Sequence, residues 1–437
     1  MNYGNMFTPR PYTPMNWPST VVDAMNDDST LLVTVTGRDR PGVSARLLST
    51  LSVFPVTLSD LEQVVIGGRL VLGALLSVDD TVAPGVSKAR LFEELRSAVE
   101  KTAIDLDMDV EFSKGNARVS ASSEGRLHVT VLADPLRPGA LGAIASCVAR
   151  AGSNIDRIER LSSYPVTSIE LDISGTDLDR LRGDLAMEAA TQSIDVAVQR
   201  SGLHRRAKHL VVMDVDSTLI QGEVIELLAA HAGCAEEVAR VTEEAMRGNL
   251  DFEESLRRRV ALLKGLDASA IDAVREELVL TPGARTLIRT LKRLDYECAI
   301  VSGGFTQITD ALVERLGIDY SAANTLEIVD GKLTGDLVGP IIDREGKAQA
   351  LRHFAKEADV SLMQTVAIGD GANDLDMLRT AGLGVAFNAK PVVQEQAHTS
   401  VNFPYLDAIV FLLGVSREEI EAADLAVGDS GDSTESD

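Results

Sequence analysis

The 437-residue chain is predicted to be an α/β protein: a Rossmann-like parallel sheet with a helical cap insert, preceded by two ferredoxin-like (βαββαβ) α+β domains. Three observations predict this fold class. Residues 30–200 contain a weak internal repeat of strand-like and helix-like segments in one order. Residues 209–420 alternate apolar runs with amphipathic segments, as a parallel sheet with helices on both faces does. Only helical patterns occur between 224 and 280, which indicates an inserted cap.

Each copy of the repeat is expected to run strand, helix, strand, strand, helix, strand. The first copy has these segments at 31–36, 43–54, 57–66, 69–78, 86–102 and 107–112. The second copy has them at 127–132, 140–151, 154–161, 167–173, 177–192 and 194–199. This order is the split βαββαβ unit, so we predict two such domains, at residues 28–118 and 123–202.

The α/β body is expected to span residues 205–420, with the cap at 224–280. Its strands are predicted at 209–213, 297–301, 365–368 and 384–386, and Asp330-Gly331 predicts a hairpin within 326–338. Both ends of the chain have compositions typical of disorder. Residues 1–27 are rich in Pro, Asn, Thr and Met, and residues 424–437 are acidic and rich in Gly and Ser.

The composition excludes several classes of partner. Hydrophobic residues make up 45% and charged residues 25%, as in ordinary globular proteins, and the formal net charge is −24. Nucleic acids and anionic membranes would repel this chain, so neither is expected as a partner. The three cysteines form no disulfide or metal-binding pattern, and no signal sequence or membrane-spanning run is visible. We therefore expect a cytoplasmic location.

Asp214 and Asp216 follow the first predicted strand of the body. Two carboxylates this close disfavour double ionisation unless a cation or a shared proton compensates. A bound Mg²⁺ meets this condition, with one Asp attacking and the other moving a proton. The pattern therefore points to phosphoryl transfer.

Three further motifs are expected at the same edge of the sheet, where open α/β sheets bind ligands. Ser302-Gly303-Gly304 follows a strand, and its hydroxyl and permissive main chain suit hydrogen bonds to a phosphate. Lys347, at a helix start, is a point-charge partner for a phosphoryl group. Asp370 and Asp374 belong to a turn whose oxygen ligands suit Mg²⁺. Alone, each motif reads as a loop, a surface lysine or a helix cap; together they indicate one site.

Substrate specificity is expected to come from the cap. Glu223 is an acid at the start of the cap that can pair with a substrate ammonium group. Phe252 and Arg259 are seven residues apart on a capped helix, so they share a face. An aromatic ring beside a guanidinium suits the carboxylate of a small amino acid. The alternatives are an ordinary core position for Phe252 and a helix-start acid at Glu223.

Asp-x-Asp-Ser-Thr, Ser-Gly-Gly, the lone Lys and Gly-Asp-Gly-x-Asn-Asp together resemble the haloacid dehalogenase superfamily, and within it the phosphoserine phosphatases, over about residues 205–415. The repeat is similar to two ACT domains, which sense amino acids in many proteins. The resemblance implies Mg²⁺-dependent hydrolysis of O-phospho-L-serine to L-serine and phosphate through an aspartyl-phosphate. This reaction is the last step of serine biosynthesis.

The resemblance also implies roles for single residues. Asp214 would be the nucleophile and Asp216 the general acid and base. Mg²⁺ would be held by the Asp214 carboxylate, the Asp216 carbonyl and Asp370, with Asp374 in support. The substrate would be bound by Glu223, Phe252, Arg259, Ser302, Gly303, Lys347 and Asn373.

The repeat suggests regulation, because the expected chemistry needs no additional domain. Gly42 and Gly139 follow Pro where a helix begins, so a ligand can approach main-chain N–H groups there. The alternative is that both are only tight-turn glycines, and Asn154 is a third candidate contact. The hypothesis is feedback by serine or another amino acid in a homodimer formed through the ACT-like domains.

Two other functions stay open. The first is a phosphatase of the same superfamily for another small phosphomonoester, such as a sugar phosphate. Glu223 and Arg259 disfavour it, because a sugar offers neither ammonium nor carboxylate. The second is an amino-acid-sensing regulator without activity, which the intact set of catalytic motifs disfavours.

Overall fold

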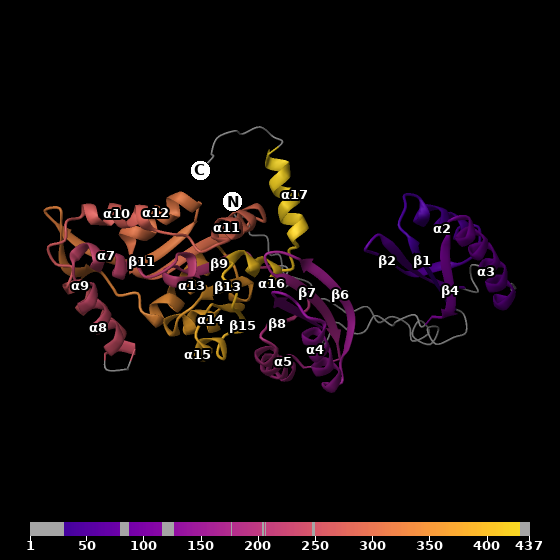
Figure 1. Ribbon diagram of the computed structural model, residues 1–437, viewed down its shortest axis with the longest axis horizontal. Coiled ribbons are helices and arrows are strands. Elements are labelled where there is room, and N and C mark those ends of the chain that lie inside the picture. Colours follow the sequence, from indigo (N-terminus) through magenta and orange to yellow (C-terminus); the bar gives the residue numbers. More distant parts are fainter. Residues whose placement is uncertain are drawn as a thin grey trace, which may run out of the picture. The chain divides into compact units, whose positions relative to one another are not determined.

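The computed structural model describes residues 30–78, 87–115, 126–175, 177–202, 205, 207–246 and 250–428. The chain divides into two compact units, residues 1–122 and 123–437. The first unit contains one ACT-like domain, and the second contains the other ACT-like domain together with the α/β body (Figure 1). The predicted tail at 1–27 lies outside the described residues.

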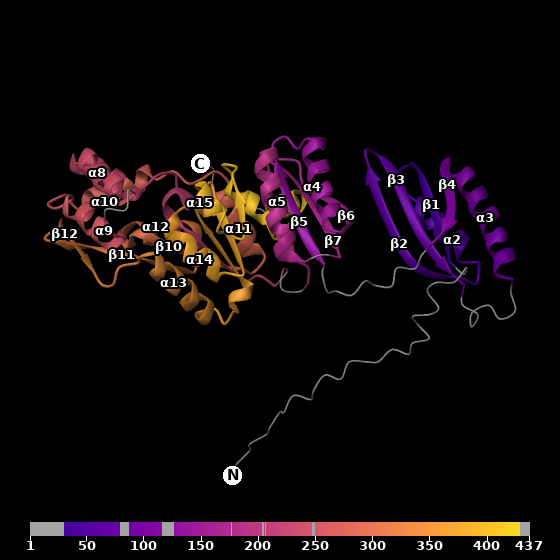
Figure 2. The ribbon, with the colours of Figure 1, turned by 90° about the horizontal axis from the view of Figure 1, so that it is seen from below.

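The first ACT-like domain has the predicted βαββαβ order. Its elements are β1 (Thr30–Arg38), α2 (Val43–Leu51), β2 (Thr57–Ile66), β3 (Arg69–Ser77), α3 (Lys88–Asp105) and β4 (Met108–Lys114). The strands are antiparallel in the order β2-β3-β1-β4, with both helices on one face of the sheet (Figure 2). Alternate residues of β1 are buried beneath these helices, whereas every residue of the edge strand β2 is exposed.

The second ACT-like domain repeats this topology. Its elements are β5 (Leu127–Ala133), α4 (Pro138–Arg150), β6 (Asn154–Ser162), β7 (Thr167–Ser174), α5 (Leu178–Gln192) and β8 (Asp195–Arg200). The sheet order is β6-β7-β5-β8. One face carries α4 and α5, and residues of the other face, such as Leu132 and Ala197, belong to the core of the body. The repeat predicted from the sequence is therefore confirmed.

Buried and part-buried hydrogen bonds join the second ACT-like domain to the body. Gln199 Nε2 donates to the carbonyl oxygen of Leu412 at 2.7 Å. The main-chain N and the Nδ2 of Asn402 each donate to the carboxylate of Asp195 at 2.6 Å. The sheet of this domain therefore packs directly against the body.

The body has a seven-stranded sheet with the order β12-β11-β10-β9-β13-β14-β15. The strands are β9 (Leu210–Asp214), β10 (Glu297–Phe305), β11 (Tyr320–Val329), β12 (Lys332–Val338), β13 (Thr365–Gly369), β14 (Leu383–Phe387) and β15 (Thr399–Val401). Neighbouring strands are parallel except for the β11–β12 hairpin, which turns at Asp330-Gly331 as predicted. The sequence did not predict β15 or the parallel start of β11, because neither is a continuous apolar run.

Helices cover both faces of this sheet, as the alternation predicted. They are α11 (Ala284–Arg293), α12 (Thr306–Leu316), α13 (Arg344–Glu357), α14 (Leu375–Thr380), α15 (Pro391–Gln394), α16 (Ile409–Leu412) and α17 (Arg417–Gly428). Residues of α11, α12 and α16 pack on one face, and residues of α13 and α14 pack on the other. Short turns η3 (Leu362–Gln364), η4 (Ala372–Asp374) and η5 (Leu406–Ala408) connect these elements.

The cap consists of helices, as expected. After the turn η2 (Val215–Leu219) come α7 (Val224–Ala232), α8 (Ala235–Met246), α9 (Phe252–Ala261) and α10 (Ser269–Glu277). Between α9 and α10, Gly265 N donates to Leu333 O at 2.8 Å, and Leu333 N donates to Leu266 O at 2.9 Å. The cap is thereby fastened to strand β12 of the hairpin.

The predicted disorder from Asp424 onward is wrong for the first part of that segment, because α17 continues to Gly428. Arg289 and Arg293 of α11 both form ion pairs with Asp424 and hold this end of the helix. The acidic composition of this segment predicted a solvated tail, but these ion pairs with α11 hold its first residues in a helix. Residues 429–437 lie outside the described residues.

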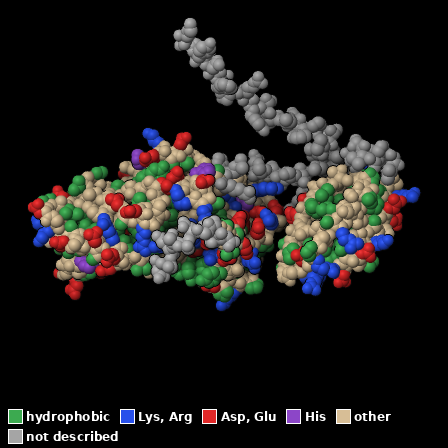
Figure 3. Space-filling view, turned by 90° about the horizontal axis from the view of Figure 1, so that it is seen from above, with side chains coloured by type: hydrophobic (Ala, Val, Ile, Leu, Met, Phe, Trp, Pro, Cys, Tyr) green, Lys and Arg blue, Asp and Glu red, His purple; other side chains and the backbone are tan. Residues whose placement is uncertain are grey.

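No helix in the described part of the chain has the length and apolar character needed to cross a membrane. Figure 3 shows Lys and Arg side chains interspersed with Asp and Glu, rather than gathered into one broad basic surface on the visible face. All three cysteines are free thiols, and Cys147 and Cys298 are buried.

Candidate active site

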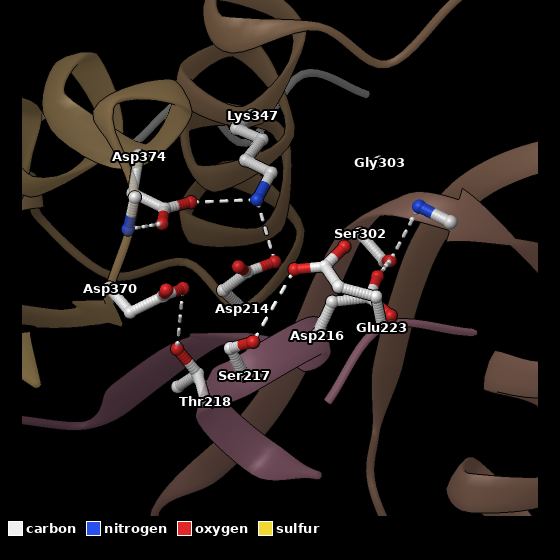
Figure 4. Close-up of polar contacts among 12 residues, drawn as sticks. Asp214, Asp216, Ser217, Thr218, Glu223, Ser302, Gly303, Lys347, Asp370 and Asp374 are labelled. Carbon is white, nitrogen blue, oxygen red and sulfur yellow. Dashed lines mark hydrogen bonds and ion pairs between the residues drawn. The ribbon is translucent and has the colours of Figure 1, made fainter. Parts of the chain in front are cut away.

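The candidate active site lies at the carboxyl ends of the central strands β10, β9 and β13. Asp214 ends β9, Ser302 lies near the end of β10, and Asp370 directly follows β13. These strands are parallel neighbours, so side chains from distant parts of the sequence meet at one edge. Figure 4 shows them converging there with Lys347.

A sharp turn after β9 separates Asp214 from Asp216. Ser217 has φ of 59° and ψ of 2°, in the left-handed region that non-glycine residues rarely adopt. Its main-chain N donates to Gly222 O at 3.0 Å, which holds the turn closed. The turn leaves Asp214 on the sheet and directs Asp216 toward the start of the cap.

Lys347 is buried between two carboxylates. Its Nζ donates to Asp214 Oδ1 at 2.6 Å and to Asp374 Oδ1 at 2.7 Å, and its side chain is 1% exposed. Burial alone would lower the pKa of Lys347, but Asp214 and Asp374 raise this pKa above its ordinary value, so the ammonium stays charged. The alternative of a solvated surface lysine is therefore wrong.

Asp214, Asp370 and Asp374 form a cluster in which one carboxylate oxygen of each residue lies within 4.8 Å of the others. Burial, followed by the charge of Asp374, raises the pKa of Asp214 well above its usual value. The same two causes raise the pKa of Asp370 to about 6. In the protein alone, the cluster therefore resists full ionisation.

This donor set fits a divalent cation that prefers oxygen ligands. Among the described residues, the ammonium group of Lys347 pairs with two of the three carboxylates, Asp214 and Asp374, so the cluster has more carboxyl groups than ammonium groups. Opposite ligands of Mg²⁺ lie about 4 Å apart, and these oxygens all lie within 4.8 Å of one another. A bound cation would favour ionisation of Asp214 and Asp370 and so lower both pKa values.

Asp216 lies among neutral hydrogen-bond donors instead. Val224 N donates to its Oδ1 at 2.8 Å, and Ser302 Oγ donates to its Oδ2 at 3.1 Å. Burial raises the pKa of Asp216 against the opposing effect of these bonds. A carboxyl group with a raised pKa holds its proton more readily near neutral pH, as a general acid must.

The Ser302-Gly303-Gly304 segment bulges out of the sheet. Val301 pairs with Ala322 and Phe305 pairs with Asn324, so β10 uses four residue steps where β11 uses two. Gly304 N donates to Ser302 Oγ at 2.7 Å within the bulge. A Cβ atom at Gly303 would lie 3.0 Å from Cζ of Phe252, so the aromatic ring covers this loop closely and glycine fits best there.

Glu223 and Arg259 face the same site from the cap. Glu223 precedes α7 and accepts a hydrogen bond from Ser217 Oγ at 3.3 Å. Desolvation of its carboxylate, followed by the charges of Asp216 and Asp370, raises the pKa of Glu223 to about 7. Burial lowers the pKa of Arg259, whereas the charges of Glu223 and Asp216 act in the opposite direction. An acid and a guanidinium thus lie beside the carboxyl group of Asp216.

The capped helix predicted to carry Phe252 and Arg259 is confirmed. Asp251 Oδ1 accepts a hydrogen bond from Glu254 N at 2.7 Å at the start of α9. Phe252 packs against the core and over Gly303, so the alternative of a core position is supported, and its role toward a substrate stays a prediction. Glu223 does begin a helix, but its side chain makes no capping hydrogen bond there.

The remaining candidates lie where the motifs predicted. Asn373 is half-buried in η4, between Asp370 and Asp374 in sequence. Gly42 precedes α2 with φ of 92°, as a tight turn requires, and Gly139 lies in the first turn of α4. No heavy atom lies within 4 Å of a Cβ placed at either glycine, so their main chain is open to a ligand. Asn154 begins β6, and its Nδ2 donates to Asp156 Oδ1 at 2.7 Å.

Two polar residues of the site were missed from the sequence. Thr218 Oγ1 donates to Asp370 Oδ1 at 3.4 Å. Because Thr218 is the last residue of the Asp-Val-Asp-Ser-Thr motif, the motif could have identified it as a residue of the site. Asn324 donates through Nδ2 to Gly303 O at 2.8 Å. It lies in a Ser-Ala-Ala-Asn stretch of β11 that has no catalytic pattern.

Comparisons with known proteins cover almost the whole chain. The family described as haloacid dehalogenase-like hydrolase matches residues 211–379, and ACT domain families match 29–113 and 127–199. A phosphoserine phosphatase of Streptomyces coelicolor is 58% identical over 407 residues, which cover 93% of this chain and 97% of the relative. The chain belongs to the phosphoserine phosphatase family. The recognition made from the motifs and from the repeat is therefore confirmed.

Two more members of the phosphoserine phosphatase family support this assignment. Phosphoserine phosphatase SerB2 of Mycobacterium tuberculosis is 52% identical over 403 residues, which cover 92% of this chain and 96% of the relative. The crystal structure of a probable phosphoserine phosphatase from Vibrio cholerae, in unliganded form, is 36% identical with a TM-score of 0.54. That match covers 70% of this chain and 90% of the solved one.

Proposed function

We propose that this chain hydrolyses O-phospho-L-serine to L-serine and phosphate, with Mg²⁺ as its metal. The observation that carries the proposal is the meeting of two groups of residues. Asp214, Asp216 and Lys347 gather at the strand ends and suit any phosphomonoester. Glu223 and Arg259 approach from the cap and suit a substrate with both an ammonium and a carboxylate.

In the first step, a carboxylate oxygen of Asp214 attacks phosphorus and forms an aspartyl-phosphate. The bond between phosphorus and the seryl oxygen breaks. Asp216 gives its proton to the leaving oxygen, so serine departs with a neutral hydroxyl group. Lys347, with the Ser302 and Gly303 segment, offsets the negative charge of the phosphoryl oxygens.

In the second step, a water molecule attacks phosphorus. Asp216, now ionised, takes a proton from this water, and the bond between phosphorus and Asp214 breaks. Phosphate leaves, Asp214 is again a carboxylate, and Asp216 is again protonated. The same side chain therefore acts first as acid and then as base.

The proposed metal ligands are Asp214, Asp370 and the main-chain carbonyl of Asp216, with Asp374 and Asn373 in support. Mg²⁺, when bound, supplies positive charge that neutralises phosphoryl oxygens and favours the ionised form of Asp214. The excess of carboxylates over ammonium groups in the described site supports a cation at this position.

We also propose amino-acid feedback by serine through the ACT-like domains, in a homodimer that uses these domains. The open main chain at Gly42 and Gly139, the exposed Asn154 and the exposed edge strand β2 support this proposal. The domain limits 28–118, 123–202 and 205–420 stay a prediction. So does the cytoplasmic location, which three free thiols suit.

The function is tested by assaying the full chain with Mg²⁺ on phosphoserine and on a set of sugar phosphates. We expect kcat/KM to be highest for phosphoserine, and Asp214→Asn to lower kcat by at least about 10³-fold. Asp310→Asn, an exposed acid of α12, is the matched control and should leave kcat unchanged. Equal kcat/KM for a sugar phosphate, or retained activity in Asp214→Asn, would contradict the proposal.

Regulation is tested separately by adding L-serine to the full chain and measuring inhibition. Gly139→Val fills the open main chain at the start of α4 and should weaken the inhibition. Gly142→Ala, an equally open position on the same helix, should not. If all three chains are inhibited equally, serine acts only as a product at the catalytic site.

A further inference from the structure

Asn324 is a buried amide of β11 that no catalytic motif contains. Its residue exposure is 1%. Nδ2 donates to the carbonyl oxygen of Gly303 at 2.8 Å, and Oδ1 accepts from Ile342 N at 2.7 Å. The first contact reaches the bulge of β10, and the second holds the Asn324 amide in a fixed orientation.

The bulge explains why Gly303 needs this partner. Between Val301 and Phe305 the ladder of β10 and β11 is interrupted, so the carbonyl of Gly303 has no regular strand partner. The hydrogen bond to this carbonyl is part-buried, and a carbonyl shielded from water without a partner is unfavourable by up to about 1–3 kcal/mol. The Asn324 side chain therefore takes the place that a main-chain N–H holds in a regular sheet.

A continuous hydrogen-bonded path leads from Asn324 to Asp216. The Gly303 carbonyl and the Gly304 N–H belong to the same planar peptide group. Gly304 N donates to Ser302 Oγ at 2.7 Å, and Ser302 Oγ donates to Asp216 Oδ2 at 3.1 Å. Figure 4 shows Ser302 beside Asp216. Because the peptide is rigid, fixing its carbonyl also fixes its N–H and hence the direction of the Ser302 hydroxyl.

We propose that Asn324 is a positioning residue for the proton transfer by Asp216. It holds the Gly303–Gly304 peptide, the peptide orients the Ser302 hydroxyl, and this hydroxyl orients the carboxyl group of Asp216. The inference rests on the proposed function, in which Asp216 protonates the leaving oxygen. Asn324 touches neither substrate nor metal in this role.

The test compares substrates that differ in their need for an acid. A seryl oxygen leaves poorly without a proton, whereas p-nitrophenolate leaves readily, and kcat/KM reports the steps up to loss of the leaving group. Asn324→Ala should lower kcat/KM for phosphoserine by about 10–100-fold, the range for a misplaced catalytic group. For p-nitrophenyl phosphate the loss should be less than about threefold.

Gln307→Ala is the matched control, because this amide also binds β11 with two hydrogen bonds. Its Nε2 donates to Leu326 O at 2.8 Å, and its Oε1 accepts from Leu326 N at 3.2 Å, away from the bulge. We expect Gln307→Ala to lower Tm about as much as Asn324→Ala does, but to leave kcat/KM at the wild-type value for both substrates. If Asn324→Ala does not fold, Asn324→Asp serves instead, because it keeps an acceptor for Ile342 N and loses only the donor.

A second variant tests the path itself. Ser302→Ala also removes a hydroxyl offered to the phosphoryl group, so it should lower kcat/KM on both substrates and lower it further for phosphoserine. The double variant with Asn324→Ala should lose little more than Ser302→Ala alone. Equal losses on both substrates in Asn324→Ala, or fully additive losses in the double variant, would overturn the inference while leaving the proposed function intact. A wild-type chain that hydrolyses p-nitrophenyl phosphate but no alkyl phosphate would overturn both, since no leaving group then needs the proton.

Discussion

Asp214 and Asp216 are two residues apart but lie in different surroundings. Asp214 contacts a buried ammonium, and Asp216 contacts a main-chain N–H and a hydroxyl. The left-handed conformation of Ser217 turns the chain from Asp216 toward the cap, whose Val224 N donates to Asp216. One motif thus yields one carboxylate suited to attack and one suited to hold a proton.

Arg259→Ala tests whether the cap selects the amino-acid part of the substrate. A charge-assisted hydrogen bond contributes about 1.5–3 kcal/mol, so kcat/KM for phosphoserine should fall by about 10–100-fold. The value for p-nitrophenyl phosphate, which has no carboxylate, should change less than about threefold.

Arg258→Ala is the control for Arg259→Ala on the same helix. Arg258 is half-exposed and pairs with Glu254 at 2.5 Å on the outer surface, so both substrates should be hydrolysed as by the wild type. Equal losses on both substrates in Arg259→Ala would remove this residue from substrate selection.

Most elements could be predicted because local patterns agree with the tertiary structure. The apolar run before Asp214 becomes β9, and Asp251 begins α9 as its sequence indicated. The failures lie where long-range contacts decide. β15 has three residues and forms by pairing with β14, and α17 is held by arginines far away in sequence.

The same limit applies to the site. From the sequence, the residues in recognisable motifs could be assigned to one site. They include Lys347, which is buried among carboxylates. Asn324 carried no pattern, because its importance comes from the register between β10 and β11. Such a role depends on which carbonyl a bulge leaves without a partner, and only the paired strands reveal that.

At the scale of an element, Asp251→Ala tests how far α9 depends on its cap. Loss of the hydrogen bond to Glu254 N should lower the free energy of unfolding by about 1 kcal/mol. Because α9 carries Phe252 and Arg259, KM for phosphoserine should also rise. Urea unfolding and steady-state kinetics measure the two effects.

Asp251→Asn is the control for the cap, because it keeps an oxygen acceptor at the same position. It should retain both stability and KM. If Asp251→Asn is as damaging as Asp251→Ala, the negative charge near the helix start, rather than the hydrogen bond, is responsible.

At the scale of the molecule, the second ACT-like domain and the body should unfold together, because Asp195 and Asn402 join them. Asp195→Ala removes the buried carboxylate that accepts two hydrogen bonds from Asn402 and should lower the free energy of unfolding by about 1–3 kcal/mol. Glu159→Ala removes only a surface ion pair with Arg157 and should change this energy by less than about 0.5 kcal/mol. Urea unfolding with equal effects of the two variants would contradict this coupling.

The site itself should make the stability of the protein depend on pH and on Mg²⁺. Burial and neighbouring charges raise the pKa of Asp370 to about 6 and that of Glu223 to about 7, above their unfolded values near 4. Between the unfolded and folded pKa values, these two carboxyl groups stay protonated in the folded chain but are ionised in the unfolded chain. Without metal, the free energy of unfolding should therefore fall as pH rises from about 4 to about 7.

Mg²⁺ should reverse this trend, because it binds the ionised carboxylates of the folded state only. At 100 times its Kd a ligand stabilises by about 2.7 kcal/mol, so Mg²⁺ should raise Tm clearly at about pH 7.5 and much less at about pH 5, where protons compete. Thermal unfolding with EDTA or MgCl₂ at both pH values measures this difference.

Asp370→Asn separates the site from the rest of the molecule in this measurement. It should flatten the fall in stability with pH and remove most of the gain in Tm from Mg²⁺, whereas the exposed Asp310→Asn should change neither. Asp195, whose pKa burial raises to about 6, lies at the domain contact and contributes a pH dependence that Mg²⁺ cannot remove. A gain from Mg²⁺ that is equal at both pH values, or that survives in Asp370→Asn, would therefore place the metal elsewhere than among Asp214, Asp370 and Asp374.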